Sequence, residues 1–121
     1  MPREELYLQD IIQSANAIGR FLEGVSKENF LADELLQSAI LHKLAIIGEA
    51  AAQISKELKS RHPEVEWKAI IGFRNIVIHA YFSIIWEIVW TTATEDVPML
   101  SRQIQLILES DFPDFELKPN S

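Results

Sequence analysis

The chain contains no cysteine, which excludes disulfide bonds, zinc–thiolate sites, iron–sulfur clusters and any cysteine nucleophile. This absence is consistent with a reducing compartment. The first residues, Met1 to Glu5, are charged and lack the apolar core of a signal peptide. No uninterrupted apolar run approaches the ~20 residues that a membrane span needs. We therefore expect a cytoplasmic protein that does not enter a membrane.

Glycine is also scarce, with four residues in a chain of 121, and no hairpin signal or internal repeat is present. Apolar residues recur instead at three- and four-residue steps, a spacing that predicts amphipathic helices. A chain of this length fits one domain, and its hydrophobic fraction of 48% is more than so small a domain hides internally. We therefore expect one helical domain that associates with a second copy of itself.

Basic residues are fewer than acidic ones, 11 against 18, and the formal net charge is −7. This balance excludes a protein that coats nucleic acid non-specifically, because such proteins neutralise many phosphates with Lys and Arg. Five of the eleven basic residues nevertheless fall between Lys56 and Arg74, the only net-positive stretch. Two interpretations stay open for it: a solvated helix end with its loop, or a rim that attracts phosphate.

Four helical segments and one short turn are predicted, at residues 4–22, 28–31 (the turn), 33–61, 67–81 and 84–111. Ser26 and Asp33 are expected as N-caps, Gly24 and Pro63 as helix ends, and Pro98 as a kink inside the last segment. The expected fold is an all-α, antiparallel, up-and-down bundle of four to five helices in residues 1–111, followed by an extended tail at 112–121.

The third helix carries an unusual polar group among its apolar residues. Asn75 and His79 are four positions apart and share one side of a helix, whereas Arg74 and His79 point about 140° away from each other. Arg74, Ile78 and Tyr81 are expected on an adjacent strip. Such polar side chains are costly to bury unpaired, so we expect them to face a cleft or an interface.

The run from Trp67 to Phe82 resembles the HEPN-domain signature R-x-x-x-x-H, in the R-N-x-x-x-H-x-Y form of HepT-type toxins. The similarity extends to residues 46–50 and 33–35 on the long helix, and to 88–90 and 96–98 near the end of the chain. Two positions depart from the pattern. Ala80 replaces a common Gly, and residues 83–85 replace a segment that often carries an Asp.

This resemblance implies a HEPN-like homodimer that cleaves RNA as a metal-independent endoribonuclease and needs no cofactor. The implied catalytic residues are Arg74, which would hold the phosphate, His79 as acid or base, and Asn75, which would orient His79 or the substrate. The implied partner is a minimal nucleotidyltransferase antitoxin of the MntA or MNT type. It would silence the toxin by attaching AMP to Tyr81.

Other polar and aromatic residues receive simpler interpretations. His42 and His62 lack partners at useful spacing and are read as structural or surface groups, and Glu49 is read equally as a contact to the site or as a solvated carboxylate. The tryptophans at 67, 86 and 90 are read as core or interface anchors. Two alternatives to a ribonuclease stay open: a non-catalytic module that binds nucleotide or a partner enzyme, and a purely structural dimer.

Overall fold

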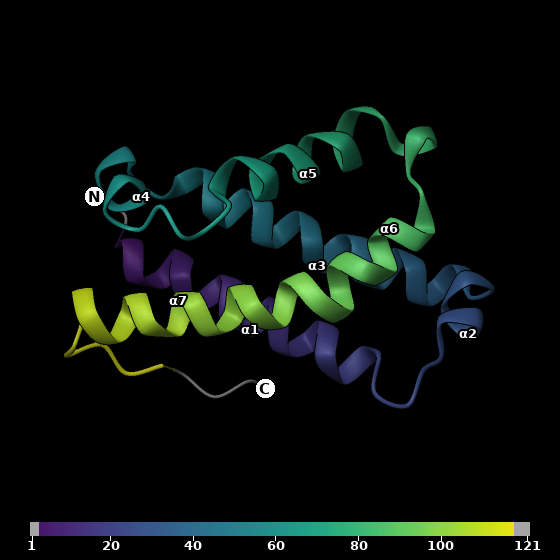
Figure 1. Ribbon diagram of the computed structural model, residues 1–121, viewed down its shortest axis with the longest axis horizontal. Coiled ribbons are helices and arrows are strands. Elements are labelled where there is room, and N and C mark those ends of the chain that lie inside the picture. The colour runs from purple at the N-terminus through teal and green to yellow at the C-terminus, as the bar shows by residue number, and fades with distance from the viewer. Residues whose placement is uncertain (1–2, 118–121) are drawn as a thin grey trace.

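The computed structural model describes residues 3–117, and this part of the chain forms helices joined by short loops, without a strand (Figure 1). The four long helices are α1 (Glu4–Phe21), α3 (Glu34–Gln53), α5 (Trp67–His79) and α7 (Val97–Asp111). The shorter elements are α2 (Lys27–Leu31), α4 (Lys56–Arg61), a 3₁₀ turn (Tyr81–Ser83), α6 (Trp86–Thr91) and a π-helical turn (Thr92–Asp96). The predicted all-α class is therefore confirmed, with more short helices than the sequence indicated.

Helix α1 follows its predicted apolar face. Leu8, Ile11, Ile12 and Ile18 are completely buried, and they pack against α3 and α7 in one continuous core. The helix ends one residue before the predicted boundary, and Gly24 follows it in the left-handed region at φ 73°. A residue with a side chain is strained in that conformation, which explains why glycine stands at this turn.

The predicted 33–61 helix is wrong in one respect, because it is two helices. Asp33 caps α3 as predicted by accepting a hydrogen bond from the Leu36 amide. At Ile54 the backbone becomes extended, and the Ser55 hydroxyl then caps α4 by accepting a hydrogen bond from the Leu58 amide. The apolar stripe continues through Ile54 and Leu58 on both sides of the break, and so periodicity alone did not reveal it.

Helix α5 packs mainly on α3, and Trp67 is its only fully buried residue. Gly48 of α3 faces it. A Cβ atom built on Gly48 would lie 2.6 Å from the Arg74 Cβ and 3.0 Å from the Ile70 carbonyl oxygen. No side chain larger than hydrogen fits there without movement of a backbone. Gly48 therefore sets how closely α5 approaches α3, and with it the position of Arg74.

The predicted kink at Pro98 takes the form of a π-helical turn. The backbone stays in the right-handed helical region from α6 through Thr92–Asp96 into α7, and Pro98 is the second residue of α7. A proline ring collides with the carbonyl one turn earlier, and the wider π turn relieves that collision. On α6, just before this junction, the rings of Trp86 and Trp90 pack against the buried Phe30 ring at centroid distances of 6.2 and 5.5 Å, so both serve as core anchors.

Several polar contacts join α1, α4 and α7 at one end of the molecule (Figure 1). Asp111 at the end of α7 accepts hydrogen bonds from the His62 Nε2 at 2.9 Å and from Arg61 at 3.0 Å. The hydrogen bond from His62, followed by those from Arg61 and Ser110, lowers the pKa of Asp111 to about 2. The expectation that His62 lacks a partner was wrong, because the partner lies 49 residues away; a structural role for His62 agrees with the contact.

Two further features bear on the predictions. Phe112 and Phe115, at the start of the predicted tail, fold back and pack partly buried against the core, so this stretch is not a free extension; residues 118–121 lie outside the described part.

Helix α3 alone among the described helices is long and apolar enough to span a membrane by length and composition. Much of it is buried between α1 and α5, as is usual for the central helix of a bundle.

Candidate active site

The Arg74 side chain is held in place by two neighbours. Its Nη1 donates to a Glu49 carboxylate oxygen at 2.7 Å, and its Nε and Nη2 donate to the Asn75 amide oxygen at 3.2 and 2.9 Å. The Arg74 side chain is 22% exposed and that of Glu49 is 58% exposed. A guanidinium has five N–H donors, so this arrangement orients the group and leaves donors for an anion arriving from solvent.

Asn75 lies on the outer side of α5 and is exposed, but its amide oxygen serves Arg74. The hydrogen bonds of the described residues include none between Asn75 and His79, although helical spacing places the two on one side. In this structure the amide therefore positions the guanidinium, and its predicted action on His79 stays a prediction.

His79 is the last residue of α5 and is exposed to solvent. The helix ends here because Ala80 leaves the helical region, with φ −139° and ψ 41°, while its amide still donates to the Ile76 carbonyl. The structure thus presents one solvent-accessible imidazole on the same helix as one anchored guanidinium.

The position of Tyr81 differs from the sequence prediction. Tyr81 was expected inside the third helix, on a strip with Arg74 and Ile78, and this is wrong because α5 stops at His79 and Tyr81 begins the 3₁₀ turn. Its ring packs edge-on against Phe82 at a centroid distance of 6.0 Å. Tyr81 remains 47% exposed, so the residue is accessible from outside.

Two residues of this site were not assigned by sequence reasoning. Glu49 was left between two interpretations, and the 2.7 Å contact with Arg74 decides for a role at the site. Gly48 was noted only as part of a stretch of small residues, whereas the structure shows that it permits the close contact with α5. The adjacent Gly48-Glu49 pair was the only sequence feature that could have indicated this contact. The packing of α3 on α5 was needed to show which helix the pair contacts.

Large apolar side chains are unusually exposed around the end of α5. Six of the twelve exposed large hydrophobic residues of the described chain fall between residues 76 and 88, on α5, the 3₁₀ turn, the N-cap of α6 and α6 itself: Ile76, Ile78, Tyr81, Phe82, Ile85 and Ile88. We call this set the α5–α6 apolar surface. Its most exposed member, Phe82, is fully accessible at 101%. Exposed apolar side chains gathered in this way indicate a candidate surface for binding another molecule.

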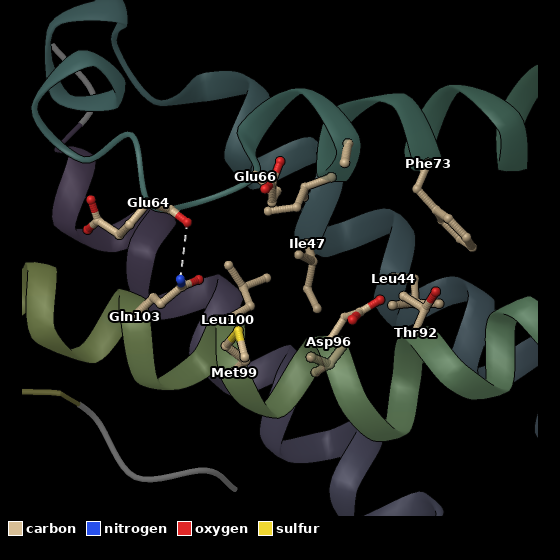
Figure 2. A pocket seen from close by; sticks show the side chains of 13 residues that line it. Leu44, Ile47, Glu64, Glu66, Phe73, Thr92, Asp96, Met99, Leu100 and Gln103 are labelled. Atoms are coloured by element: carbon tan, nitrogen blue, oxygen red, sulfur yellow. Dashed lines mark hydrogen bonds between the residues drawn. The ribbon is translucent and has the colours of Figure 1, made fainter.

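A separate cavity of about 380 Å³ lies between α5, α3 and α7 (Figure 2). Its floor is apolar, with Ile47 of α3 and Phe73 of α5 among its lining residues. Glu64, Glu66 and Asp96 also line it, and no Lys or Arg does. The lining of the cavity does not include the motif residues 74, 75 and 79, and its acidic side chains disfavour a phosphate-bearing ligand. This cavity is therefore not the candidate active site.

Comparison with known proteins identifies the family of the chain. A family model described as Ribonuclease HepT-like matches residues 11–107. The protein named Putative RNase TTE0752, from Caldanaerobacter subterraneus, is 36% identical over 105 residues, which cover 87% of this chain and 94% of that protein. Putative RNase MJ1380, from Methanocaldococcus jannaschii, is 34% identical over 101 residues, covering 84% and 93%.

A third relative, named Probable ribonuclease HepT, comes from Thermococcus cleftensis. It is 36% identical over 99 residues, which cover 82% of this chain and 90% of that protein. No solved structure matches the chain at a significant level. The family model spans most of the sequence, from the middle of α1 to the last turns of α7, and includes the whole of α5. The chain therefore belongs to the HepT-like ribonuclease family.

Proposed function

We propose that this protein is a metal-independent endoribonuclease of the cytoplasm that acts as the toxin of a type II or type VII-like toxin–antitoxin pair. One observation carries the proposal: a HepT-like chain presents an anchored Arg74 and a solvent-exposed His79 on one helix, beside a large uncovered apolar surface. Several relatives of the chain are named as RNases, which supports RNA as the substrate.

The apolar surface supports a homodimer. Covering side chains such as Phe82 and Ile78 removes apolar area from water, and a second copy of the same surface provides a matching apolar face. In a two-fold arrangement each contact occurs twice, so both copies of His79 and both of Arg74 approach one groove. A single chain provides only one such histidine, so the dimer would complete the site.

The reaction follows from these groups. One His79 takes the proton of a ribose 2′-hydroxyl, and the 2′-oxygen attacks the adjacent phosphorus. The bond from phosphorus to the 5′-oxygen breaks, and the partner copy's imidazolium gives its proton to that leaving oxygen. The products are a 2′,3′-cyclic phosphate and a 5′-hydroxyl. Arg74 binds the phosphate and stabilises the additional negative charge of the transition state.

The test is RNA cleavage by the purified protein in the presence of a metal chelator. We expect the wild type to cleave and His79→Ala to lose activity by about 10²–10⁴-fold, the usual contribution of general acid–base catalysis. His42→Ala is the matched control, because His42 is the other exposed histidine of the described chain and belongs to α3, outside the motif sequence. Equal cleavage by His79→Ala and by wild type, or dependence on a divalent ion, would contradict the mechanism.

We further propose that a nucleotidyltransferase antitoxin of the MNT type silences the enzyme at Tyr81. The tyrosine oxygen would attack the α-phosphorus of ATP, so that AMP becomes attached and pyrophosphate leaves. Tyr81 suits this chemistry because it is 47% exposed and follows directly after the helix that carries Arg74 and His79. The added phosphodiester places negative charge where substrate phosphate would bind.

Intact mass after co-expression with such an enzyme tests this step. We expect a mass increase of one or more adenylates in the wild type and in Tyr7→Phe, and none in Tyr81→Phe. Tyr7 is the only other tyrosine of the chain and lies on α1, partly buried against the core. Adenylation that persists in Tyr81→Phe would contradict the assignment. Tight nucleotide binding without RNA cleavage by the wild type would favour a non-catalytic binding module instead.

A further inference from the structure

Four residues of α5 lie on one strip that faces away from the bundle: Lys68, Gly72, Asn75 and His79. They are separated by steps of four, three and four, so a helix that turns ~100° per residue places them within about 60° of one another. The opposite side of α5 carries the partly buried residues that pack on the core, such as Ile70 and Val77. Lys68, Asn75 and His79 are all exposed. We call this set the Lys68–His79 strip.

The charge of Lys68 is not compensated within the described chain. Of the other basic residues in the positive stretch, Arg61 pairs with two carboxylates and Arg74 pairs with Glu49. Lys59 lies close enough to Glu4 for their charges to interact. Lys56, like Lys68, has no ion pair among the described residues. Among residues 3–117, no carboxylate lies within ion-pair distance of Lys68. Because the net charge of the protein is −7, an unpaired cation on the same strip as His79 is a local attraction for an anion in an otherwise repulsive field.

Gly72 is a second, independent feature of the strip. Glycine weakens the middle of a helix, and here no packing within the chain requires it, since an added Cβ would meet nothing within 4 Å among the described residues. Gly48 is the opposite case, because α5 leaves it no room. The missing side chain at Gly72, between Lys68 and Asn75 on the strip, lets another molecule approach the helix backbone closely.

We propose that the substrate RNA strand runs along the Lys68–His79 strip, with its scissile phosphate near His79, its backbone passing over Gly72 and a distant phosphate bound by Lys68. This inference rests on the proposed ribonuclease function and adds the path of the strand. The eleven-residue separation of Lys68 and His79 corresponds to about 16 Å along a helix. At ~3.4 Å per stacked nucleotide, that length spans about five nucleotides, and fewer if the strand is extended.

Cleavage of two RNAs of different length tests the path. Lys68→Ala should raise KM for a twelve-nucleotide RNA about 5- to 10-fold without changing kcat, and should leave a dinucleotide substrate unaffected. Loss of one phosphate contact should also lower the slope of log K against log salt by ~0.7, the value for single strands. Lys27→Ala is the matched control, because Lys27 is exposed on α2 at the other end of the molecule (Figure 1). Equal KM values for Lys68→Ala and wild type on the long RNA would overturn the proposal.

A second pair of variants places charge on the bare helix surface. Gly72→Glu and Gly72→Gln add side chains of nearly equal size into open space, so both should fold. The carboxylate should weaken RNA binding at least tenfold more than the amide does. Equal effects of the two variants would show that Gly72 does not face a polyanion. If either variant dissociates the protein in sedimentation experiments, the strip contacts a second copy and the proposal is overturned.

Binding of 2′-O-methyl RNA separates this proposal from the proposed activity, because that RNA lacks the attacking hydroxyl and is not cleaved. Binding that depends on Lys68, in a protein that cleaves no RNA, would refute the ribonuclease activity and retain the strip as an RNA path. Cleavage that is independent of Lys68 and Gly72 would refute the path alone. Absence of both binding and cleavage would refute both.

Discussion

The contact between α3 and α5 at Gly48 provides the sharpest test of the structure. In Gly48→Ala the new methyl would lie 2.6 Å from the Arg74 Cβ and 3.0 Å from the Ile70 carbonyl oxygen. Carbon atoms prefer separations of ~3.5–4.0 Å, so the two helices must separate locally by about 1 Å. Neither contacted atom lies at the flexible end of a side chain. The clash therefore cannot be relieved by a rotamer change.

The expected free-energy change combines two opposing effects. Overpacking costs ~1–3 kcal/mol, and the rigidity of the contact favours the upper end of that range. Alanine in place of glycine inside a helix returns ~1 kcal/mol. Gly48→Ala should therefore lower the free energy of unfolding by about 2 kcal/mol, which corresponds to a Tm lower by ~8 °C for a domain of this size.

Gly72→Ala is the matched control in the facing helix, because an added Cβ at Gly72 meets nothing within 4 Å. It should raise the free energy of unfolding by ~1 kcal/mol through helix propensity alone. Urea titrations and thermal melts followed by circular dichroism, at one fixed protein concentration, measure both variants. If both substitutions stabilise the protein, α5 does not approach α3 as closely as described, and the account of how Arg74 is positioned fails.

Three further predictions concern the ion pairs and the apolar surface. Asp111→Asn should lower the free energy of unfolding by about 1–2 kcal/mol at pH 7. Because the folded-state pKa of Asp111 is lowered to about 2, the wild type loses this stabilisation, and the difference between the two proteins shrinks, as pH falls from ~4 toward 2. Urea titrations across this pH range measure the difference. Glu49→Ala should lower kcat for RNA cleavage about tenfold by releasing Arg74. Glu49→Gln keeps a hydrogen-bond acceptor and should lower kcat less. A kcat equal to that of wild type in both variants would show that the pair has no positioning role. Ile85→Glu on the apolar surface should give a monomer in sedimentation experiments and abolish cleavage, whereas Leu35→Glu, at an exposed leucine on α3, should do neither.

The helix boundaries and caps that depend on residues close together along the chain were predicted best from the sequence. The boundaries of α1 and the caps at Ser26 and Asp33 follow from local periodicity and capping chemistry, and the structure confirms them within one residue. Prediction from the sequence failed where distant segments meet. The contact of Glu49 with Arg74 joins residues 25 positions apart, and that of His62 with Asp111 joins residues 49 apart. No spacing rule within one helix reveals such pairs.

Helix ends inside apolar stretches were the second source of error. Tyr81 continues the apolar pattern of α5, but the backbone turns away at Ala80. Ile54 likewise continues the stripe of α3 while its own backbone is extended. Ile54 is still buried, because its side chain reaches the core from an extended residue, whereas Tyr81 is 47% exposed. Hydrophobic periodicity therefore did not reveal where either helix ends.

One end of the bundle is held by polar contacts that join Glu4, Ser55, Arg61, His62 and Asp111. We therefore expect the two ends to open locally at different rates. The opposite end, where α5 meets the 3₁₀ turn, combines exposed side chains with short helical elements. We expect amide protons at residues 80–85 to exchange with solvent by local opening long before those of α1. Residues next to α5 can then rearrange while the end held by these polar contacts keeps the protein folded.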